Sequence, residues 1–412
     1  MNTNTMSPAR SASFELPHGA PAAARTVFKL LQGLRHGSVT VQLPDGAMHR
    51  FGGESMPHAT LCLHNWNVCG AALRSGDIGF AETYIAGDWT TPNLAELLRV
   101  MVKNRTVIEG IIFGSWAGQL VYRIKHWLNR NTRANSQKNI HAHYDLGNAF
   151  YALWLDETMN YSSALFNGDL QQSLPAAQKA KVRRALEAAG VKQGDRVLEI
   201  GCGWGALAEM ATTEFGASIT GVTLSTEQLD FARARMQRHQ VEHMADLRMQ
   251  DYRDIADAPF DAICSIEMIE AVGREYWPTY FRTVAKLLKP AGRACIQSIV
   301  IDDTLFERYI HSTDFIQQYI FPGGCLPSPG AFVAEARAAG LEVVDQFAFG
   351  LDYAETLRRW RDVFLAQRDA VTANGFDERF IRIWEFYLAY CEAAFDEGNI
   401  DVVQYTLQKP AH

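Results

Sequence analysis

An apolar run that ends in closely spaced glycines constrains the fold of this 412-residue chain more than any other feature. Residues 197–205 read Val-Leu-Glu-Ile-Gly-Cys-Gly-Trp-Gly, the pattern of a buried strand that turns into a helix. Glycines at such a turn let the backbone bend tightly and approach a ligand, at the edge where open α/β sheets bind nucleosides. By itself the pattern indicates a site for a nucleotide-like ligand and no particular reaction.

Short apolar segments alternate with helical ones from Arg196 onward. The segments 227–238 and 276–288 have the periodicity of amphipathic helices and lie between runs rich in β-branched residues. Such alternation predicts an α/β fold with a mostly parallel sheet and crossover helices. The expected strands are 196–200, 218–222, 246–250, 262–266 and 294–299, with 341–349 and 401–408 completing the sheet at its edge.

Two features favour S-adenosylmethionine over a dinucleotide as the ligand. Glu199 precedes the glycines, where its carboxylate can face a methionine ammonium, and the third glycine of the dinucleotide fingerprint is missing. The second strand ends in Gly-Val-Thr-Leu-Ser at 221–225, without an acidic ribose ligand. Asp251 follows the third strand and can accept a hydrogen bond from an adenine amine. The structural alternatives are a buried salt bridge for Glu199 and a helix cap for Asp251.

Length and composition favour an ordinary protein of two domains. The content of 48% hydrophobic residues and the net charge of −7 give no sign of extensive disorder or of a nucleic-acid partner. No apolar run reaches the roughly 18 residues of a membrane-spanning helix. The seven scattered cysteines fit reduced thiols and a cytoplasmic location better than a disulfide framework, and Cys62 and Cys69 do not indicate a zinc site.

The first part of the chain is expected to form a smaller α+β domain. Strand-like runs at 38–43 and 59–63 are followed by glycine-containing turns and helical stretches, and the stretch 75–89 resembles a turn-rich cap. The basic and aromatic segment 107–128 fits either an anionic membrane surface or packing against the protein itself. The expected organisation is a disordered tail at 1–25, the α+β domain at 26–128, a linker at 129–140 and the larger domain at 141–412.

Several motifs occur in a fixed order along the chain. They are His-Tyr-Asp-Leu-Gly-Asn at 143–148, Met-Asn-Tyr-Ser at 159–162, the glycine motif, 221–228, 251–254, 266–273 and Tyr-Ile-Phe-Pro-Gly-Gly at 319–324. Together they resemble the family of cyclopropane-fatty-acyl-phospholipid synthases and mycolic acid methyltransferases, from about Val27 to near the C-terminus. The resemblance implies a seven-stranded class I S-adenosylmethionine-dependent methyltransferase domain with an acyl tunnel, preceded by a smaller domain of the lipid-binding type.

The resemblance also implies a set of site residues. Family members hold a bicarbonate ion beside the transferred methyl group, and Glu270, Tyr353 and the backbone of Ile299 match three of its ligands. The family's cysteine and histidine ligands are replaced by Ser163 and Gln297, which can still hydrogen-bond an anion, although glutamine cannot carry a proton. The positions that contact the cofactor match Tyr161, Ser162, Gly201, Gly203, Trp204, Gly205, Thr223 and Gln228.

The implied activity is methyl transfer to the cis double bond of an unsaturated phospholipid acyl chain. Proton loss from the new methyl group then forms a cyclopropane, whereas loss from a neighbouring carbon gives a methyl-branched alkene. We expect Glu270, directly or through bicarbonate, to govern this proton loss; Glu267 shares its face if the segment is helical, and fits a structural role equally well. A non-catalytic lipid-binding relative and a small-molecule N- or O-methyltransferase stay open as alternatives.

The expected partners follow from this activity. They are the phospholipid acyl chain and the inner membrane surface, to which the protein would bind peripherally. No metal and no nucleic acid is expected, and a homodimer stays open because the sequence does not reveal the oligomeric state.

Overall fold

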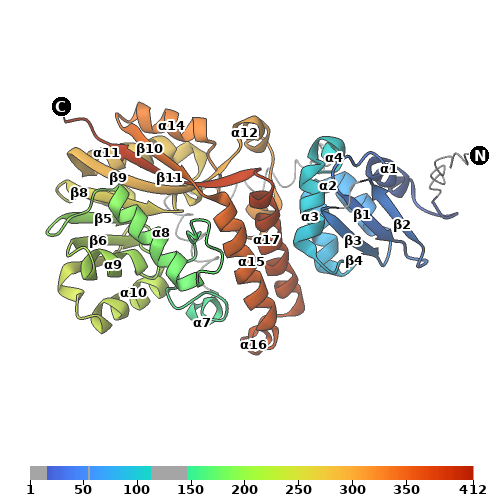
Figure 1. The fold of residues 1–412 in the computed structure, drawn as a ribbon, viewed down its shortest axis with the longest axis horizontal. Helices are drawn as coiled ribbons and strands as arrows, with labels where there is room; N and C mark the ends of the chain where they lie inside the picture. Colours follow the sequence, from blue (N-terminus) through green and yellow to red (C-terminus); the bar gives the residue numbers. More distant parts are fainter. Residues whose placement is uncertain (1–15, 54–55, 113–145, 412) are drawn as a thin grey trace, which may run out of the picture.

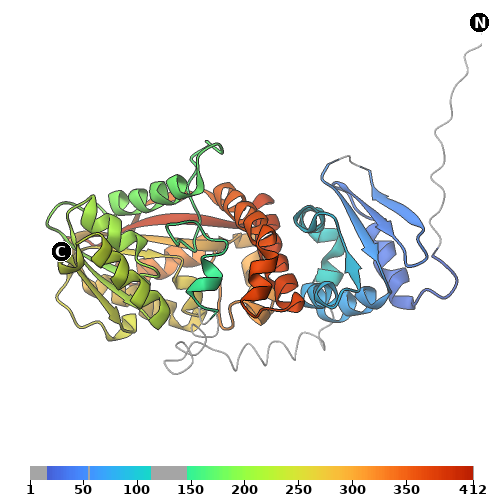
Figure 2. The same cartoon turned by 90° about the horizontal axis from the view of Figure 1, so that it is seen from below.

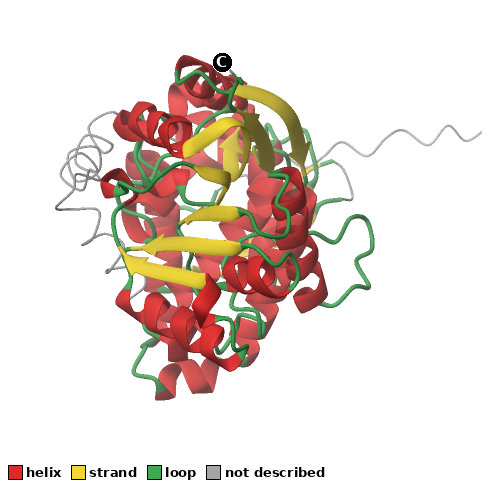
Figure 3. Cartoon of the chain, turned by 90° about the vertical axis from the view of Figure 1, so that its left-hand side faces the viewer, coloured by secondary structure: helices red, strands yellow, loops and turns green. Residues whose placement is uncertain are grey.

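The computed structural model describes residues 16–53, 56–112 and 146–411, and its largest element is a seven-stranded sheet (Figures 1 and 3). Only β11 runs antiparallel to its neighbours in this sheet. Each of the seven predicted segments forms one strand, which confirms the predicted fold class. In sheet order the strands are β10 (Glu342–Ala348), β11 (Ile400–Gln408), β9 (Leu288–Ile301), β8 (Phe260–Ile266), β5 (Arg196–Ile200), β6 (Ser218–Thr223) and β7 (Ala245–Met249).

Helices cover both faces of the sheet and bury its alternating apolar side chains in two separate clusters. Local sequence sets where these helices begin. The Ser225 hydroxyl accepts from the backbone N–H of Gln228 at the start of one helix, and Ser328 caps another that has Pro329 in its first turn. One face carries α8 (Leu174–Ala188), α9 (Ala206–Thr213) and α10 (Thr226–Arg238), and the other carries α11 (Trp277–Leu287) and α14 (Pro329–Ala338).

A second helical layer stands at the end of the sheet, between it and the N-terminal part of the chain (Figure 1). Three of its helices connect β10 to β11, and two shorter ones begin before the Tyr-Ile-Phe-Pro-Gly-Gly motif in the sequence. They are α15 (Gly350–Ala366), α16 (Arg368–Ala373) and α17 (Glu378–Asp396), with α12 (Asp303–Tyr309), α13 (Phe315–Tyr319) and the short α7 (Asn148–Tyr151) nearby. Single 3-10 turns are η1 (Glu242–Met244), η2 (Tyr252–Asp254), η3 (Ile269–Ala271) and η4 (Arg274–Tyr276).

The N-terminal domain is a small α+β unit, as predicted. Its sheet has the order β2-β1-β3-β4, with β1 parallel to β3 and antiparallel to β2. Its elements are α1 (Ala22–Leu31), β1 (Ser38–Gln42), β2 (Met48–Gly52), β3 (His58–Leu63), α2 (Asn67–Ala86), β4 (Trp89–Thr90), α3 (Leu94–Lys103) and α4 (Arg105–Ile112).

Two expectations for this domain were wrong. The stretch 75–89 is not a turn-rich cap, because most of it belongs to α2, and only Gly76, with φ 65° and ψ −137°, breaks the helix. The expected tail at 1–25 is too long, since α1 begins at Ala22 and Ala24 is fully buried. The linker at 129–140 and most of the segment 107–128 lie outside the described residues.

The two domains share one hydrophobic core, which runs from α1 through α17. Figures 1 and 2 show the N-terminal domain beside α17, and Arg99 reaches Glu397 across the boundary, with 3.0 Å between Nε and Oε1. Tyr84 donates its hydroxyl hydrogen bond to Glu385 over 2.8 Å. Among the residues that the structure describes, no helix combines the length and apolar character needed to span a bilayer. All seven cysteines are described, and none forms a disulfide.

Candidate active site

A cavity of about 170 Å³ lies at the carboxyl ends of β5 and β6, where the glycine motif turns into α9. This is the edge at which open α/β sheets bind ligands. The structure therefore brings together most of the residues predicted to hold the cofactor. Those that line the cavity are Tyr161, Ser162, Glu199, Gly201, Gly203, Trp204, Thr223 and Gln228.

The three glycines of the motif have different roles. All have positive φ, and a Cβ on Gly203 would meet no described atom within 4 Å, so this position is open towards the cavity. A Cβ on Gly201 would lie 2.9 Å from Met268, and one on Gly205 would lie 2.9 Å from Ala232 of α10. Gly205 does not line the cavity and instead lets α9 and α10 approach each other, so only the first two glycines face a ligand.

Glu199 carries the feature that fits a methionine ammonium. Its side chain is buried, and no described residue hydrogen-bonds its Oε2 atom. Burial raises the pKa of Glu199 well above its ordinary value, and the buried Lys181 opposes the rise. A cationic ligand group would satisfy this oxygen and favour its charged form. The residues present therefore fit S-adenosylmethionine.

Asp251 has the arrangement of a helix cap, which is the structural alternative to binding adenine. Its carboxylate caps η2 by accepting from the backbone N–H of Arg253, and it pairs with the guanidinium of the same residue at 2.5 Å. The described residues that line this end of the cavity are Gln250 and Tyr252, on either side of Asp251. A role for Asp251 in binding adenine stays a prediction, and Gln250 and Tyr252 were missed.

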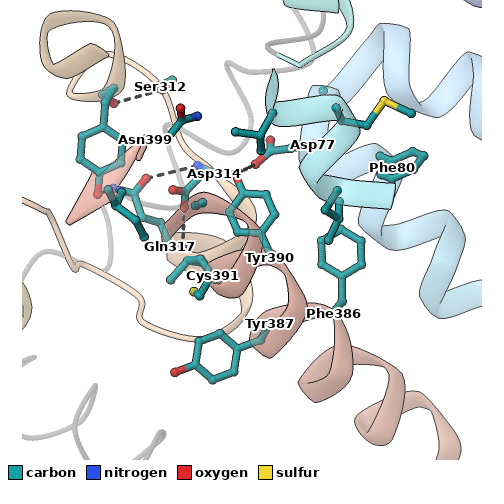
Figure 4. Close-up of a pocket in the computed structure, with 18 of the residues that line it drawn as sticks. Asp77, Phe80, Ser312, Asp314, Gln317, Phe386, Tyr387, Tyr390, Cys391 and Asn399 are labelled. Carbon is teal, nitrogen blue, oxygen red and sulfur yellow. Dashed lines mark hydrogen bonds between the residues drawn. The ribbon is translucent and has the colours of Figure 1, made fainter. Parts of the chain in front are cut away.

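A second, apolar cavity of about 350 Å³ runs between the two domains and reaches the cofactor cavity. Its walls come from α1, α2 and α3 on one side and from α13, α15 and α17 on the other. Figure 4 shows the part where Asp77 of the N-terminal domain faces Asp314 and Tyr390. Both cavities are lined by Tyr161, Glu267 and Ala271, so the two compartments meet at these residues.

Glu267 is the centre of the predicted catalytic residues. Its Oε1 atom accepts from the backbone N–H of Ser163 over 2.9 Å and from Nε2 of Gln297 over 2.7 Å. Its Oε2 atom accepts from the hydroxyl of Tyr353 over 2.6 Å. Burial raises the pKa of Glu267, while Lys181 and the three donors oppose that rise. Three of the residues predicted to bind an anion therefore already hold a carboxylate of the chain itself.

Glu270 lies close by in a different environment. It is in η3, whereas Glu267 directly follows β8 and has φ 50°, so the segment is not one helix and the two glutamates do not share a helix face. One Glu270 oxygen accepts from the backbone N–H of Ile299, and the other has no hydrogen-bond partner within the described parts of the chain. Burial, followed by the charge of Glu267, raises the pKa of Glu270 to about 8. At neutral pH this shift favours the protonated form of Glu270.

The comparison with known families decides the identity of the fold. The model of the mycolic acid cyclopropane synthetase family matches residues 131–405. The chain belongs to this family. The tuberculostearic acid methyltransferase of Mycobacterium tuberculosis is 43% identical to it over 81% of this chain and 79% of the relative. The cyclopropane-fatty-acyl-phospholipid synthase of Escherichia coli K12 is 32% identical over 90% of this chain and 95% of its own.

Solved structures of the cyclopropane synthetase family agree with the fold. A mycolic acid cyclopropane synthase, crystallised with S-adenosylhomocysteine and CTAB, superposes with a TM-score of 0.62 at 31% identity, over 66% of this chain and 98% of that chain. With the glycine motif and Glu199 in place, the chain is an S-adenosylmethionine-dependent methyltransferase.

The family's bicarbonate does not fit this site. Ser163, Gln297 and Tyr353 all donate to Glu267, and the Gln297 and Ser163 side chains are fully buried away from the cavity. A free anion would also lie beside the carboxylate of Glu267 and be repelled by it. The expectation that these residues hold bicarbonate is therefore not supported.

Lys181 is a further residue beside the site that the sequence did not point to. It lies in α8 with no exposed surface, and its Nζ atom donates to Ser162 Oγ over 2.5 Å and to Asn160 Oδ1 over 3.3 Å. Burial lowers its pKa to about 8, against the attraction of Glu267, Asp156 and Glu199. A lysine on the alanine-rich, buried face of a helix was the available signal, because such a group needs charged or polar partners.

Proposed function

We propose that this methyltransferase alkylates the cis double bond of an unsaturated acyl chain carried by a phospholipid. The observation that carries the proposal is the apolar cavity between the domains, which meets the cofactor cavity at Glu267. An apolar channel suits a hydrocarbon chain, and a junction of two cavities is where an acceptor atom can meet a methyl donor. The relatives named above are enzymes of fatty acids or phospholipids, which supports the same substrate class.

S-adenosylmethionine supplies an electrophilic methyl group on a sulfonium. The chain has to align the alkene, because an isolated double bond is a weak nucleophile. The π electrons of the alkene form the new C–C bond to the methyl carbon while the bond from that carbon to sulfur breaks and leaves its electron pair on sulfur. The neighbouring alkene carbon becomes a cation. The aromatic side chains of Tyr161, Phe321 and Tyr353 line the cavity and can stabilise that charge with their ring faces.

Glu267 is the proton acceptor in this proposal, in place of the expected Glu270. It lines both cavities, and its three hydrogen-bond donors favour a carboxylate, whereas the raised pKa of Glu270 favours its protonated form at neutral pH. A C–H bond of the substrate cation breaks, its proton passes to Glu267, and its electron pair quenches the cation. If the proton leaves a neighbouring carbon, the product is a methyl-branched alkene; if it leaves the new methyl group, a ring closes.

We propose the methyl-branched product, and cyclopropane formation is the second candidate. The relative with 43% identity is named as a methyltransferase, and this chain has Ser163, Gln297 and its own Glu267 carboxylate at the bicarbonate position. Ring closure is favoured by the synthase that matches 90% of this chain. A peripheral membrane position and a homodimer are further parts of the expectation, and they stay predictions.

Product analysis tests this proposal. A host that makes unsaturated phospholipids is grown with methionine labelled in its methyl group, with and without the protein, and its acyl chains are separated by gas chromatography and identified by mass spectrometry. The proposal expects a labelled, methyl-branched unsaturated chain only when the protein is present. A labelled cyclopropane chain would establish the second candidate, and unlabelled acyl chains would contradict both.

A further inference from the structure

Glutamine side chains form a buried connection between the surface of the sheet and Glu267. Gln404 of β11 lies directly opposite Gln297 of β9, and both side chains are fully buried. Arg184 Nη1 donates to Gln404 Oε1 over 2.7 Å, Gln404 Nε2 donates to Gln297 Oε1 over 3.0 Å, and Gln297 Nε2 donates to Glu267 Oε1 over 2.7 Å. The series runs from α8, across two strands, to the junction of the two cavities.

The direction of each amide is fixed by groups that can act in one way only. A guanidinium has donors and no acceptor, so Gln404 must turn its oxygen towards Arg184. The backbone carbonyl of Lys181 accepts from Gln404 Nε2 over 3.2 Å, and a carbonyl cannot donate. Gln404 therefore presents N–H groups to Gln297, which has to accept with its oxygen and offer its own N–H groups to Glu267.

Arg184 is itself held in place at the edge of the sheet. Its guanidinium lies over the ring of Phe347, 3.8 Å from the centroid, and it contacts Asp345 Oδ2 at 3.1 Å. Both partners belong to β10, so the donor at the outer end of the series does not depend on the substrate or the cofactor. A planar, always charged donor suits this position because it sets the orientation of an amide without titrating.

This arrangement favours one protonation state of Glu267. A carboxylate only accepts, and it receives the fixed N–H of Gln297 well, whereas a protonated carboxyl would have to turn its O–H away from a donor. The other titratable groups around Glu267 are Lys181 of α8, Glu270 of η3 and Tyr353 of α15. Lys181 and the hydrogen-bond donors around Glu267 favour its charged form, and the charge of Glu267 in turn raises the pKa of Glu270.

We propose that Arg184 and Gln404 are positioning residues that, through Gln297, keep Glu267 as the charged proton acceptor of the reaction. The inference rests on the proposed function of Glu267. It extends the site by two residues, one in α8 and one in β11, neither of which lines either cavity.

The decisive variant is Gln404→Glu, which keeps an oxygen for Arg184 and removes the N–H groups that fix Gln297. Gln297 is then free to turn its oxygen towards Glu267, which disfavours the carboxylate. Because a hydrogen bond to a charged group corresponds to about one pH unit or more, we expect the acid limb of the kcat/KM profile to move upward by about that amount. The affinity for S-adenosylhomocysteine, measured by calorimetry, should not change.

Arg184→Met provides a second test at a partly exposed position, where the loss of folding is less of a concern. It should shift the acid limb in the same direction by less, since Gln404 keeps its contact with the Lys181 carbonyl. Thr406→Val is the matched control on β11, because the Thr406 hydroxyl is buried without a hydrogen-bond partner in the described structure and its loss should leave the profile unchanged.

The outcomes separate the two proposals. If Glu267→Gln is inactive while Gln404→Glu and Arg184→Met keep the parent profile, the positioning role is overturned and the base assignment stands. If Gln404→Glu does not fold, the profile of Arg184→Met alone decides, and an unshifted limb overturns the role. If Glu267→Gln keeps full activity, the base assignment fails, and the positioning role fails with it.

Discussion

The two cavities differ in how their functional residues are assembled. The cofactor cavity is built by segments that follow consecutive parallel strands, and its key residues, Glu199 and Gly203, lie within five positions of the sequence. The proposed proton-accepting site instead collects Ser163, Gln297 and Tyr353 from three distant segments around Glu267. The core of the cofactor side can thus be read from one short segment of the sequence, whereas the acyl side depends on the whole tertiary fold.

The difference between the two cavities leads us to expect the largest change in turnover for Glu267→Gln. Removal of a general base costs about 10²- to 10⁴-fold in rate, so turnover should fall by that factor. The affinity for S-adenosylhomocysteine should stay close to that of the parent protein, because Glu199 and the open glycine turn at Gly203 are left in place. Steady-state kinetics on phospholipid vesicles and calorimetry give the two numbers. A large loss of cofactor affinity would show that the two cavities are not independent.

Glu199→Gln should instead act mainly on the affinity for the cofactor. Its unsatisfied oxygen is expected to meet the ammonium of the cofactor, and a hydrogen bond between charged groups is worth about 1.5–3 kcal/mol. The dissociation constant of S-adenosylhomocysteine should therefore rise about 10- to 100-fold. Asp251→Asn sharpens this test. It should lower the affinity for S-adenosylhomocysteine only if Asp251 has a role in binding adenine. If Glu199→Gln binds S-adenosylhomocysteine as tightly as the parent protein does, Glu199 does not contact the ammonium group.

On the acyl side, Asp77 should make the stability of the protein depend on pH. Burial, followed by the charge of Asp314, raises its pKa to about 7, and its Oδ2 atom accepts from Tyr390 and from the backbone of Phe315. A raised carboxyl pKa means that the folded state is favoured by protonation, so stability should fall as the pH rises from about 4 through 7.

Thermal unfolding at pH 5.5 and pH 8 measures this effect. We expect the midpoint of the parent protein to be lower at pH 8, and the difference to shrink in Asp77→Asn by on the order of a few °C. Asp369→Asn, at an exposed carboxylate of α16, is the control and should leave the difference unchanged. Equal differences in Asp77→Asn and the parent protein would show that Asp77 does not carry the pH dependence.

The smallest effect on turnover is expected from the removal of bicarbonate. The donors that would hold it are already occupied by Glu267, so turnover in buffer freed of carbon dioxide should equal turnover with added bicarbonate. A clear loss of rate in the depleted buffer would mean that the site takes up the free ion after all.

The strands of the larger domain could be predicted because their apolar runs are short and separated by helical periodicity. The run 196–200 coincides with β5, and 294–299 falls inside β9. This strand begins earlier, at Leu288, which pairs with Phe260 before a shift of register at the turn-like Lys-Pro-Ala-Gly of 289–292. Helix α2 was missed because its serine, glycine and aspartate residues are typical of turns, although only Gly76 leaves the helical conformation.

The proposed proton-accepting site could be predicted only in part. The resemblance identified Ser163, Gln297 and Tyr353, but not which group they contact. Glu267 was weighed as a structural partner because its backbone conformation, with φ 50°, cannot be inferred from a pattern of residue types. The contribution of Gln404 depends on the pairing of β11 with β9 more than a hundred positions earlier in the sequence, and no local signal reports such a pairing.

The most direct test of the central claim is chemical rescue of Glu267→Ala. Truncation removes the carboxylate, leaves its three donors without an acceptor and opens a space in which a small anion can bind. If Glu267 is the built-in proton acceptor, this variant should be nearly inactive and should regain part of its turnover as bicarbonate is added, while the parent protein stays indifferent to the ion. Full activity of Glu267→Ala without bicarbonate would contradict the account.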